Sequence, residues 1–185
     1  MKDIYHASMD VHDIFSAFAP ATHADAMLSL SGVTGGFYAL LLKSVKDCYP
    51  EADLNKISQH CFKSIGVLKS TEYLSKRSPS MMDYKDTRGC ILTLVMAIFN
   101  ASPEYIFNVE KFDREHSIIM LTGKDRYLRS ANACGIADQI QFPTLTEFLK
   151  GAAETIGIEC KVEAHELSAN GADELFIRYE VTLIE

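Results

Sequence analysis

The segment 144–185 constrains the fold more than any other part of the chain, because its hydrophobic period changes once, from that of a helix to that of a strand. Over 144–156, apolar residues recur at the three- and four-residue spacing of one helix face. Thr144 and Glu147 have the spacing of a capping box, and Gly157 is suited to the left-handed position that ends a helix. We therefore expect a helix at 144–156.

A strand-like period of two begins directly after this helix. Apolar and polar residues alternate in two runs over 158–184, with Asn170-Gly171 between them. This pattern predicts an antiparallel hairpin with one face towards the core and a charged face towards water. Its last part, 172–185, is expected to leave an exposed sheet edge, so a homodimer is one predicted assembly.

The rest of the chain contains a second hairpin and three helical segments. Residues 105–121 are predicted to form two strands, and together the two hairpins give a four-stranded antiparallel sheet. Helices are expected over 25–49, 53–68 and 83–100, and the last is apolar almost all round, as a central helix should be. The order of elements predicts an α+β domain with its N-terminal helices packed on the sheet.

Two features interrupt the helical half of the chain. Gly32, Gly35 and Gly36 fall inside the first predicted helix, where glycine is unfavourable, which indicates close packing, a kink or room for a ligand. Close packing is the simplest of these alternatives. Residues 69–83 are polar and contain a Ser-Pro-Ser breaker, which predicts a loop or lid.

Length and charge restrict the possible functions. The 185 residues, 48% of them hydrophobic, suit a single ligand-binding domain over 1–185, in which 1–24 is a poorly defined lead-in. Lysine and arginine number 18 against 25 acidic residues, which gives a formal net charge of −7. A general nucleic-acid binder needs a basic surface, so nucleic acid is not an expected partner.

The cysteines, histidines and apolar runs favour a cytoplasmic chain without a metal. The five cysteines are an odd number with no C-x-x-C pair, which suits reduced thiols. His6, His12 and His23 match no compact ligand spacing, so no metal site is predicted. The longest apolar run, 91–99, is far shorter than the roughly 20 residues of a membrane helix, so we expect no span and no signal peptide.

The second half of the chain carries a family resemblance. The sequences FLKGAAE at 148–154, VEAHEL at 162–167 and ANGADE at 169–174 resemble the C-terminal end of the 4-vinyl reductase-like, or hydrocarbon-binding, domains. The same architecture occurs in haem nitric-oxide/oxygen-binding domains and in TRAPP vesicle-tethering subunits. Glu174 stands where the family usually has a cysteine, so no role of that cysteine is carried over. The resemblance implies a sensor or carrier of a small, apolar or amphipathic ligand.

The residues themselves are consistent with such a ligand site. The apolar central helix, the methionines and the glycines could line a concave apolar pocket, with cationic and phenolic side chains fixing a carboxylate or phosphate head at its mouth. The alternative is that the same apolar residues form a packed core. The residues predicted to contact the ligand are Phe37, Met96, Phe99, Met120, Arg126, Tyr127 and Arg129.

A haem-based gas sensor is one alternative function. In the haem-binding form of this architecture, an axial histidine lies on the central helix and a Tyr-x-Ser-x-Arg clamp holds the propionates. The predicted central helix contains no histidine, and the clamp-like residues 127–130 have the right types in the wrong order. We therefore expect neither haem nor another cofactor.

A small hydrolase is the other alternative. The sequence GFYALL at 36–41 resembles the front half of the amino-thiazoline-carboxylate hydrolase-like family. Cys134 would then be the nucleophile, with Asp138, His116 or His165 as its base. Because a single Cys–Asp spacing is unspecific, a protein without this activity is the simpler expectation.

Overall fold

The computed structural model describes residues 19–75, 84–169 and 174–184, and these residues form an α+β fold, as predicted. The sheet contains β1 (Tyr105–Lys111), β2 (His116–Lys124), β3 (Cys160–Ala169) and β4 (Glu174–Leu183). The helices are α2 (His23–Cys48), α3 (Leu54–Ser75), α4 (Thr87–Ala101), α5 (Arg126–Ala133) and α6 (Leu145–Ile156), with a short 3-10 turn at Ala137–Gln139. Three predicted features lie outside the described residues: most of the lead-in, the Ser-Pro-Ser breaker and the Asn170-Gly171 turn.

The two hairpins join through their second strands, which gives the antiparallel order β1-β2-β4-β3. The prediction of an exposed edge at 172–185 is therefore wrong, because β4 pairs with β2 on one side and with β3 on the other. The edges of the described sheet are β1 and β3. A dimer formed by strand pairing would have to use one of these two strands.

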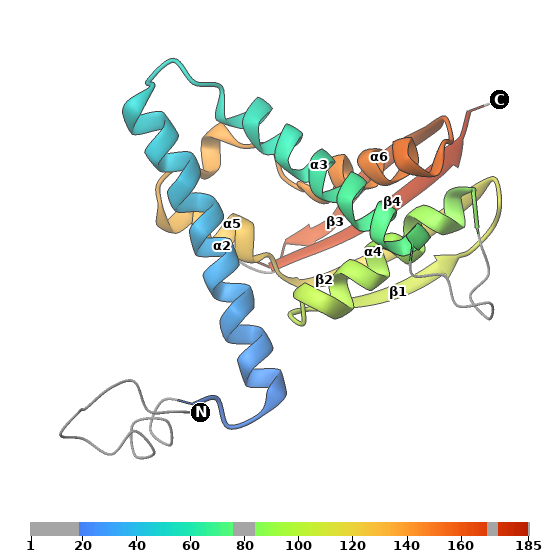
Figure 1. The fold of residues 1–185 in the computed structure, drawn as a ribbon, viewed down its shortest axis with the longest axis horizontal. Helices are drawn as coiled ribbons and strands as arrows, with labels where there is room; N and C mark the ends of the chain where they lie inside the picture. Colours follow the sequence, from blue (N-terminus) through green and yellow to red (C-terminus); the bar gives the residue numbers. More distant parts are fainter. Residues whose placement is uncertain (1–18, 76–83, 170–173, 185) are drawn as a thin grey trace.

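Strand β4 has the alternation expected of a sheet with one covered face. Its buried side chains, Leu175, Ile177, Tyr179 and Val181, face the core together with residues of α4 and α6. Figure 1 shows both helices on the same side of the sheet. The opposite face is charged: Arg178 Nε lies 2.9 Å from Glu110 Oε2, and His116 Nε2 lies 3.0 Å from Glu180 Oε2.

Helix α3 is longer than the sequence suggests. Residues 69–75 were predicted as part of a polar loop, but the helix continues to Ser75. Ser70 and Tyr73 are buried within this last stretch, and Ser70 Oγ lies 3.5 Å from Thr93 Oγ1 of α4. Packing against α4 thus offsets the low helix propensity of the serine and threonine residues.

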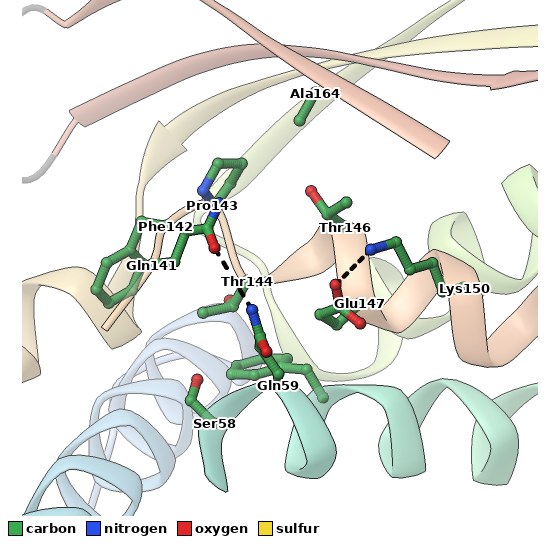
Figure 2. A pocket seen from close by; sticks show the side chains of 11 residues that line it. Ser58, Gln59, Gln141, Phe142, Pro143, Thr144, Thr146, Glu147, Lys150 and Ala164 are labelled. Carbon is green, nitrogen blue, oxygen red and sulfur yellow. Dashed lines mark hydrogen bonds and ion pairs between the residues drawn. The ribbon is translucent and has the colours of Figure 1, made fainter. Parts of the chain in front are cut away.

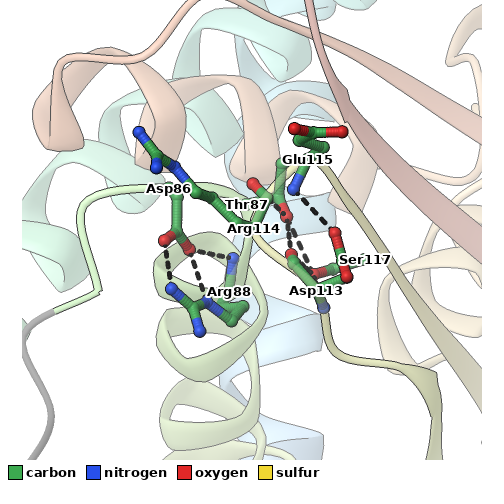
Figure 3. Close-up of polar contacts among 7 residues, drawn as sticks. All are labelled: Asp86, Thr87, Arg88, Asp113, Arg114, Glu115 and Ser117. Carbon is green, nitrogen blue, oxygen red and sulfur yellow. Dashed lines mark hydrogen bonds and ion pairs between the residues drawn. The ribbon is translucent and has the colours of Figure 1, made fainter.

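Helix α4 begins at Thr87, later than the predicted Asp83, because Asp86 caps it. Asp86 Oδ1 accepts a hydrogen bond from the backbone N–H of Arg88 at 3.0 Å. Thr87 Oγ1 donates to the carbonyl oxygen of Asp113 at 2.6 Å and lies 2.8 Å from Ser117 Oγ. Figure 3 shows these contacts, which fix the start of the central helix to the β1–β2 turn.

Helices α3 and α6 cross with their backbones in contact at two glycines. A Cβ atom at Gly66 would overlap the carbonyl oxygen of Phe148, and a Cβ atom at Gly151 would overlap that of Lys63. Neither helix could take a larger residue at this crossing without moving. The crossing therefore sets the distance between α3 and the sheet layer that α6 covers.

The two ends of α6 differ in how well the sequence predicts them. Gly157 ends the helix in the left-handed conformation, at φ 82°, as expected. The capping box is wrong: Thr144 already has helical dihedrals, φ −72° and ψ −21°, and its side chain caps no N–H. A capping residue normally has an extended backbone. Glu147 instead accepts from Lys150 Nζ at 2.6 Å.

The apolar residues form two clusters, and α2 belongs to the second. The first lies between the sheet, α4 and α6. The second lies between α2, α3, α5 and the turn that follows α5, and includes Tyr38, Leu42, Phe62 and Ile136. Helix α2 runs unbroken through its glycines, and a Cβ at Gly35 would lie 2.9 Å from the carbonyl oxygen of Arg126. At Gly35, close packing is thus the reason for the glycine.

Candidate functional site

An apolar groove lies between α2 and α3, near the end of α4 and the start of α5. Its volume is about 360 Å³, within the usual range for small-molecule sites. The groove is lined mainly by side chains of α2 and α3, several of them exposed, so it opens to solvent. The lining residues are Met27, Leu30, Ser31, Thr34, Phe37, Tyr38, Leu41, Cys61, Phe62, Ile65, Asn100, Ala101, Arg126 and Tyr127.

A smaller cavity of about 100 Å³ lies deeper, between α3, α4 and α6. It has five lining residues in common with the groove: Phe62, Ile65, Ala101, Arg126 and Tyr127. The rest of its lining is mostly apolar and includes Leu94, Ile98 and Phe148. The groove and the inner cavity therefore share two side chains that can form hydrogen bonds, Arg126 and Tyr127.

Arg126 is the buried cation of this site, with only 5% of its surface exposed. Its Nη1 donates to Ser31 Oγ at 2.7 Å and to the carbonyl oxygen of Ala101, and lies 3.3 Å from Glu104 Oε1. Its Nη2 donates to the Tyr127 hydroxyl at 2.8 Å. Its Nε is buried and has no hydrogen-bond partner among the described residues. An unpaired buried donor is costly, which makes this N–H the clearest candidate for a ligand contact.

Glu104 neutralises Arg126 within the protein. Ser31 Oγ lies 2.8 Å from both carboxylate oxygens of Glu104, so the hydroxyl, the carboxylate and the guanidinium form one network. The arginine therefore keeps one unpaired donor N–H without an uncompensated positive charge. An acceptor such as a carbonyl or hydroxyl oxygen suits this arrangement better than a second carboxylate.

Tyr127 is part of an aromatic cluster with Tyr38 and Phe62. Ring centroids are separated by 5.2 Å for Tyr38–Tyr127 and 4.9 Å for Phe62–Tyr127, both edge to face. Burial raises the pKa of Tyr38 to about 12, and burial also raises the pKa of Tyr127. Both phenols are therefore neutral at physiological pH and act as hydrogen-bonding groups on a largely apolar wall.

Asp125 positions the pair Arg126 and Tyr127 by capping α5. Its Oδ1 accepts from the backbone N–H groups of Tyr127 at 2.8 Å and Leu128 at 3.0 Å. The Tyr105 hydroxyl of β1 also hydrogen-bonds to this buried carboxyl. Burial raises the pKa of Asp125, although these donors favour its charged form. The carboxyl therefore ties the start of α5 to the edge of the sheet.

The structure separates the residues that the sequence analysis grouped as ligand contacts. Phe37, Arg126 and Tyr127 line the groove. The other four lie outside the lining of the groove and of the inner cavity. Met120 is on the charged face of the sheet, since its register partners are Asn108 and Arg178. Phe99 is 69% exposed and packs on Phe107, while Arg129 is exposed and Met96 half-buried.

Ser31 and Glu104, two partners that hold Arg126, are not among the site residues predicted from the sequence. They lie 73 positions apart, and no short motif links them. The sequence signal that could have pointed to Ser31 is a serine within the apolar part of a long predicted helix, which indicates a polar contact inside the fold.

The residues of the hydrolase alternative do not form a catalytic group. Cys134 ends α5 and packs against the second apolar cluster. His116 and His165 lie on the charged face of the sheet, where both approach Glu180, at 3.0 and 3.5 Å. No hydrogen bond or ion pair within 19–75, 84–169 and 174–184 joins Cys134 to either histidine or to Asp138. Instead, Cys90 of α4 and Cys160 of β3 hydrogen-bond to each other, a pair the sequence did not reveal.

Potential metal ligands do not cluster in the part of the chain that is described. Within it, no group of three or more His, Cys, Asp and Glu side chains is arranged to hold a metal ion. Helix α4, the central helix, carries no histidine over its length.

Helix α2 is long and apolar enough, by length and composition, to cross a membrane, and only 22% of its most apolar window is buried. It is the one such helix among the described residues, whereas no membrane span is expected from the sequence, because serine, threonine and glycine residues divide its apolar stretches into short runs. Core helices and signal sequences share these properties.

The sequence matches no protein-family model, and no curated protein matches it.

Proposed function

We propose that this protein binds a small amphipathic molecule, as a carrier or sensor, with the apolar body in the groove between α2 and α3 and a neutral oxygen acceptor on Arg126 Nε. The observation that carries the proposal is the buried Nε–H of Arg126, which is unpaired among the described residues and belongs to a side chain that lines an apolar groove. The resemblance to hydrocarbon-binding domains agrees with this choice but does not test it.

The choice of a neutral head group follows from charge. Arg126 already faces Glu104, and Ser31 completes the network. A carboxylate head would face Glu104 across the guanidinium and would lose its hydration in a mostly apolar space. A ketone, ester or alcohol oxygen needs one donor, which Nε supplies. This revises the carboxylate or phosphate head expected from the sequence.

Binding is tested first with two probes that differ in the head group. Decan-2-one and decanoate have similar apolar bodies, and their affinities can be compared by isothermal titration calorimetry at neutral pH. We expect the ketone to bind at least tenfold more tightly than the carboxylate, with a negative heat-capacity change from apolar burial. Tighter binding of decanoate, or no binding of either probe, would contradict the proposal.

Leu41 and Leu40 provide a matched pair for locating the ligand. Both are exposed on α2, at 54% and 60%, but only Leu41 lines the groove. Leu41→Ala should weaken decan-2-one binding about five- to tenfold, because about 1 kcal/mol of apolar contact is lost. Leu40→Ala should leave the affinity unchanged. Equal effects of the two substitutions would place the ligand elsewhere.

Arg126→Lys separates the donor from the charge. Lysine keeps a cation beside Glu104 but has no Nε–H in the position of the guanidinium. Decan-2-one should bind about tenfold more weakly, whereas Nile red, an apolar dye, should bind the groove with unchanged affinity. Loss of decan-2-one binding and of Nile red binding together would indicate that the groove has collapsed. Unchanged affinity for decan-2-one would show that Nε does not contact the ligand.

A further inference from the structure

A second pocket, more polar than the groove, shares Phe62 with it as a lining residue. It has a volume of about 330 Å³ and is bounded by the start of α3, residues 141–143, the first turn of α6 and Ala164 of β3. Figure 2 shows its polar side chains arranged around one opening. The lining residues are Ser58, Gln59, Phe62, Gln141, Phe142, Pro143, Thr144, Thr146, Glu147, Lys150 and Ala164.

Thr144 is the first observation that points to a ligand here. Only 4% of the residue is exposed, and it lines the pocket. Its hydroxyl has no hydrogen-bond partner in the described part of the chain. Because Thr144 has helical dihedrals, this hydroxyl cannot turn back to cap the helix that follows it.

The N-terminus of α6 is the second observation. The first backbone N–H groups of a helix have no partner within the helix, and the helix dipole favours negative charge beside them. In α6 the expected side-chain cap is missing. The N–H of Glu147 donates to the Thr144 carbonyl oxygen at 3.2 Å, so the N–H groups of Leu145 and Thr146 are the ones that still need an acceptor. The Thr144 hydroxyl and these N–H groups therefore offer several donors in one place.

The charged and amide side chains complete the arrangement. Lys150 Nζ lies 2.6 Å from Glu147 Oε1. Unlike the buried Arg126, which Glu104 holds in place, the Lys150 side chain is 47% exposed, so it can leave its carboxylate and turn towards a ligand. Gln59 Nε2 donates to Gln141 Oε1 at 3.4 Å, a long hydrogen bond that a better acceptor can replace. Phe142 and Pro143 add an apolar wall.

We propose that this pocket binds a small molecule through an oxyanion, either a carboxylate or a phosphate, held by the Thr144 hydroxyl, the first turn of α6 and Lys150. The site is separate from the groove, since Phe62 is the one lining residue common to the two. The inference therefore stands apart from the proposed function, and each can fail without the other.

The experiment titrates the full-length protein with acetate, inorganic phosphate and acetamide at constant ionic strength, with two-dimensional amide NMR as the readout. Acetamide matches acetate in shape and lacks its charge. We expect saturable shifts of the Leu145 and Thr146 amide signals with acetate or phosphate, and at least tenfold weaker binding of acetamide. The anion that binds more tightly identifies the head group. Equal binding of acetamide and acetate, or no saturable shift with either anion, would overturn the proposal.

Thr144→Val keeps the shape of the side chain and removes its hydroxyl. We expect the variant to fold with an unchanged or higher melting temperature, because a buried unpaired hydroxyl is lost, and to bind the preferred anion about tenfold more weakly. Lys150→Gln should weaken anion binding several-fold. Thr155→Val, on the same helix and outside the pocket lining, is the control and should bind as wild type. Wild-type affinity in Thr144→Val and Lys150→Gln would overturn the proposal.

Discussion

Gly66→Ala is expected to lower the free energy of unfolding by about 3 kcal/mol, the upper part of the usual range for overpacking. The added methyl group would overlap the carbonyl oxygen of Phe148, which is backbone and cannot rotate away. Helices α3 and α6 must then separate along their crossing, and the apolar contacts on both sides are lost. Urea unfolding followed by circular dichroism measures the change as a lower midpoint.

The reciprocal substitution and a control make this test specific. Gly151→Ala should cost a similar amount, because its methyl group would overlap the carbonyl oxygen of Lys63. The double variant should cost less than the sum, since helices already apart accept the second methyl group more easily. Gly36→Ala lies in open space within α2 and should stabilise the protein by about 0.5–1 kcal/mol. A neutral Gly66→Ala would show that the two backbones are not in contact.

Asp125→Ala is expected to lower the free energy of unfolding by about 3 kcal/mol. Loss of the cap of α5 costs about 1–2 kcal/mol, and the buried Tyr105 hydroxyl, left without its acceptor, costs about 1–3 kcal/mol. Because α5 carries Arg126 and Tyr127, the same variant should also lose affinity for decan-2-one. Asp125→Asn keeps one acceptor oxygen for the backbone N–H groups of Tyr127 and Leu128 and should stay within about 1 kcal/mol of wild type at neutral pH.

The pH dependence of these variants follows from the raised pKa of Asp125. Burial disfavours the charged carboxylate, so the pKa of Asp125 in the folded state lies above its ordinary value of 3.8. Its contribution to stability is therefore complete below about pH 3.8 and is lost as the pH rises through the folded-state pKa. Asparagine does not titrate, so the stability of Asp125→Asn relative to wild type should rise over that interval. A constant difference between pH 3 and pH 8 would contradict the raised pKa.

Local sequence patterns correctly predicted the elements that depend on a hydrophobic period or on a single backbone conformation. The alternation of Leu175, Ile177, Tyr179 and Val181 with polar residues identifies a half-buried strand, and Gly157 marks a helix end, because both signals come from the backbone geometry itself. The order of the strands is not local. The residues of β4 do not indicate that β2 pairs with the side of β4 that faces away from β3. The sequence therefore led to the prediction of an exposed edge at 172–185.

The candidate site was predicted only in part, for the same reason. Arg126 and Tyr127 are conspicuous in a short segment, but their partners Ser31 and Glu104 come from distant elements. Met120 was chosen as an apolar residue, although its position in the register places it on the charged face. A hydrophobic side chain can be recognised from the sequence, whereas the face and the cavity it reaches depend on how the elements assemble.

Phe62 is buried between the groove, the inner cavity and the polar pocket, and its ring contributes to the wall of all three. Any shift of the ring that enlarges one space takes volume from another. Two ligands on opposite sides would therefore compete for the position of one side chain, although they never touch. Such heterotropic coupling is negative and reciprocal. An anion beside Thr144 would lower the affinity for a molecule at Arg126, and that molecule would lower the affinity for the anion by the same factor.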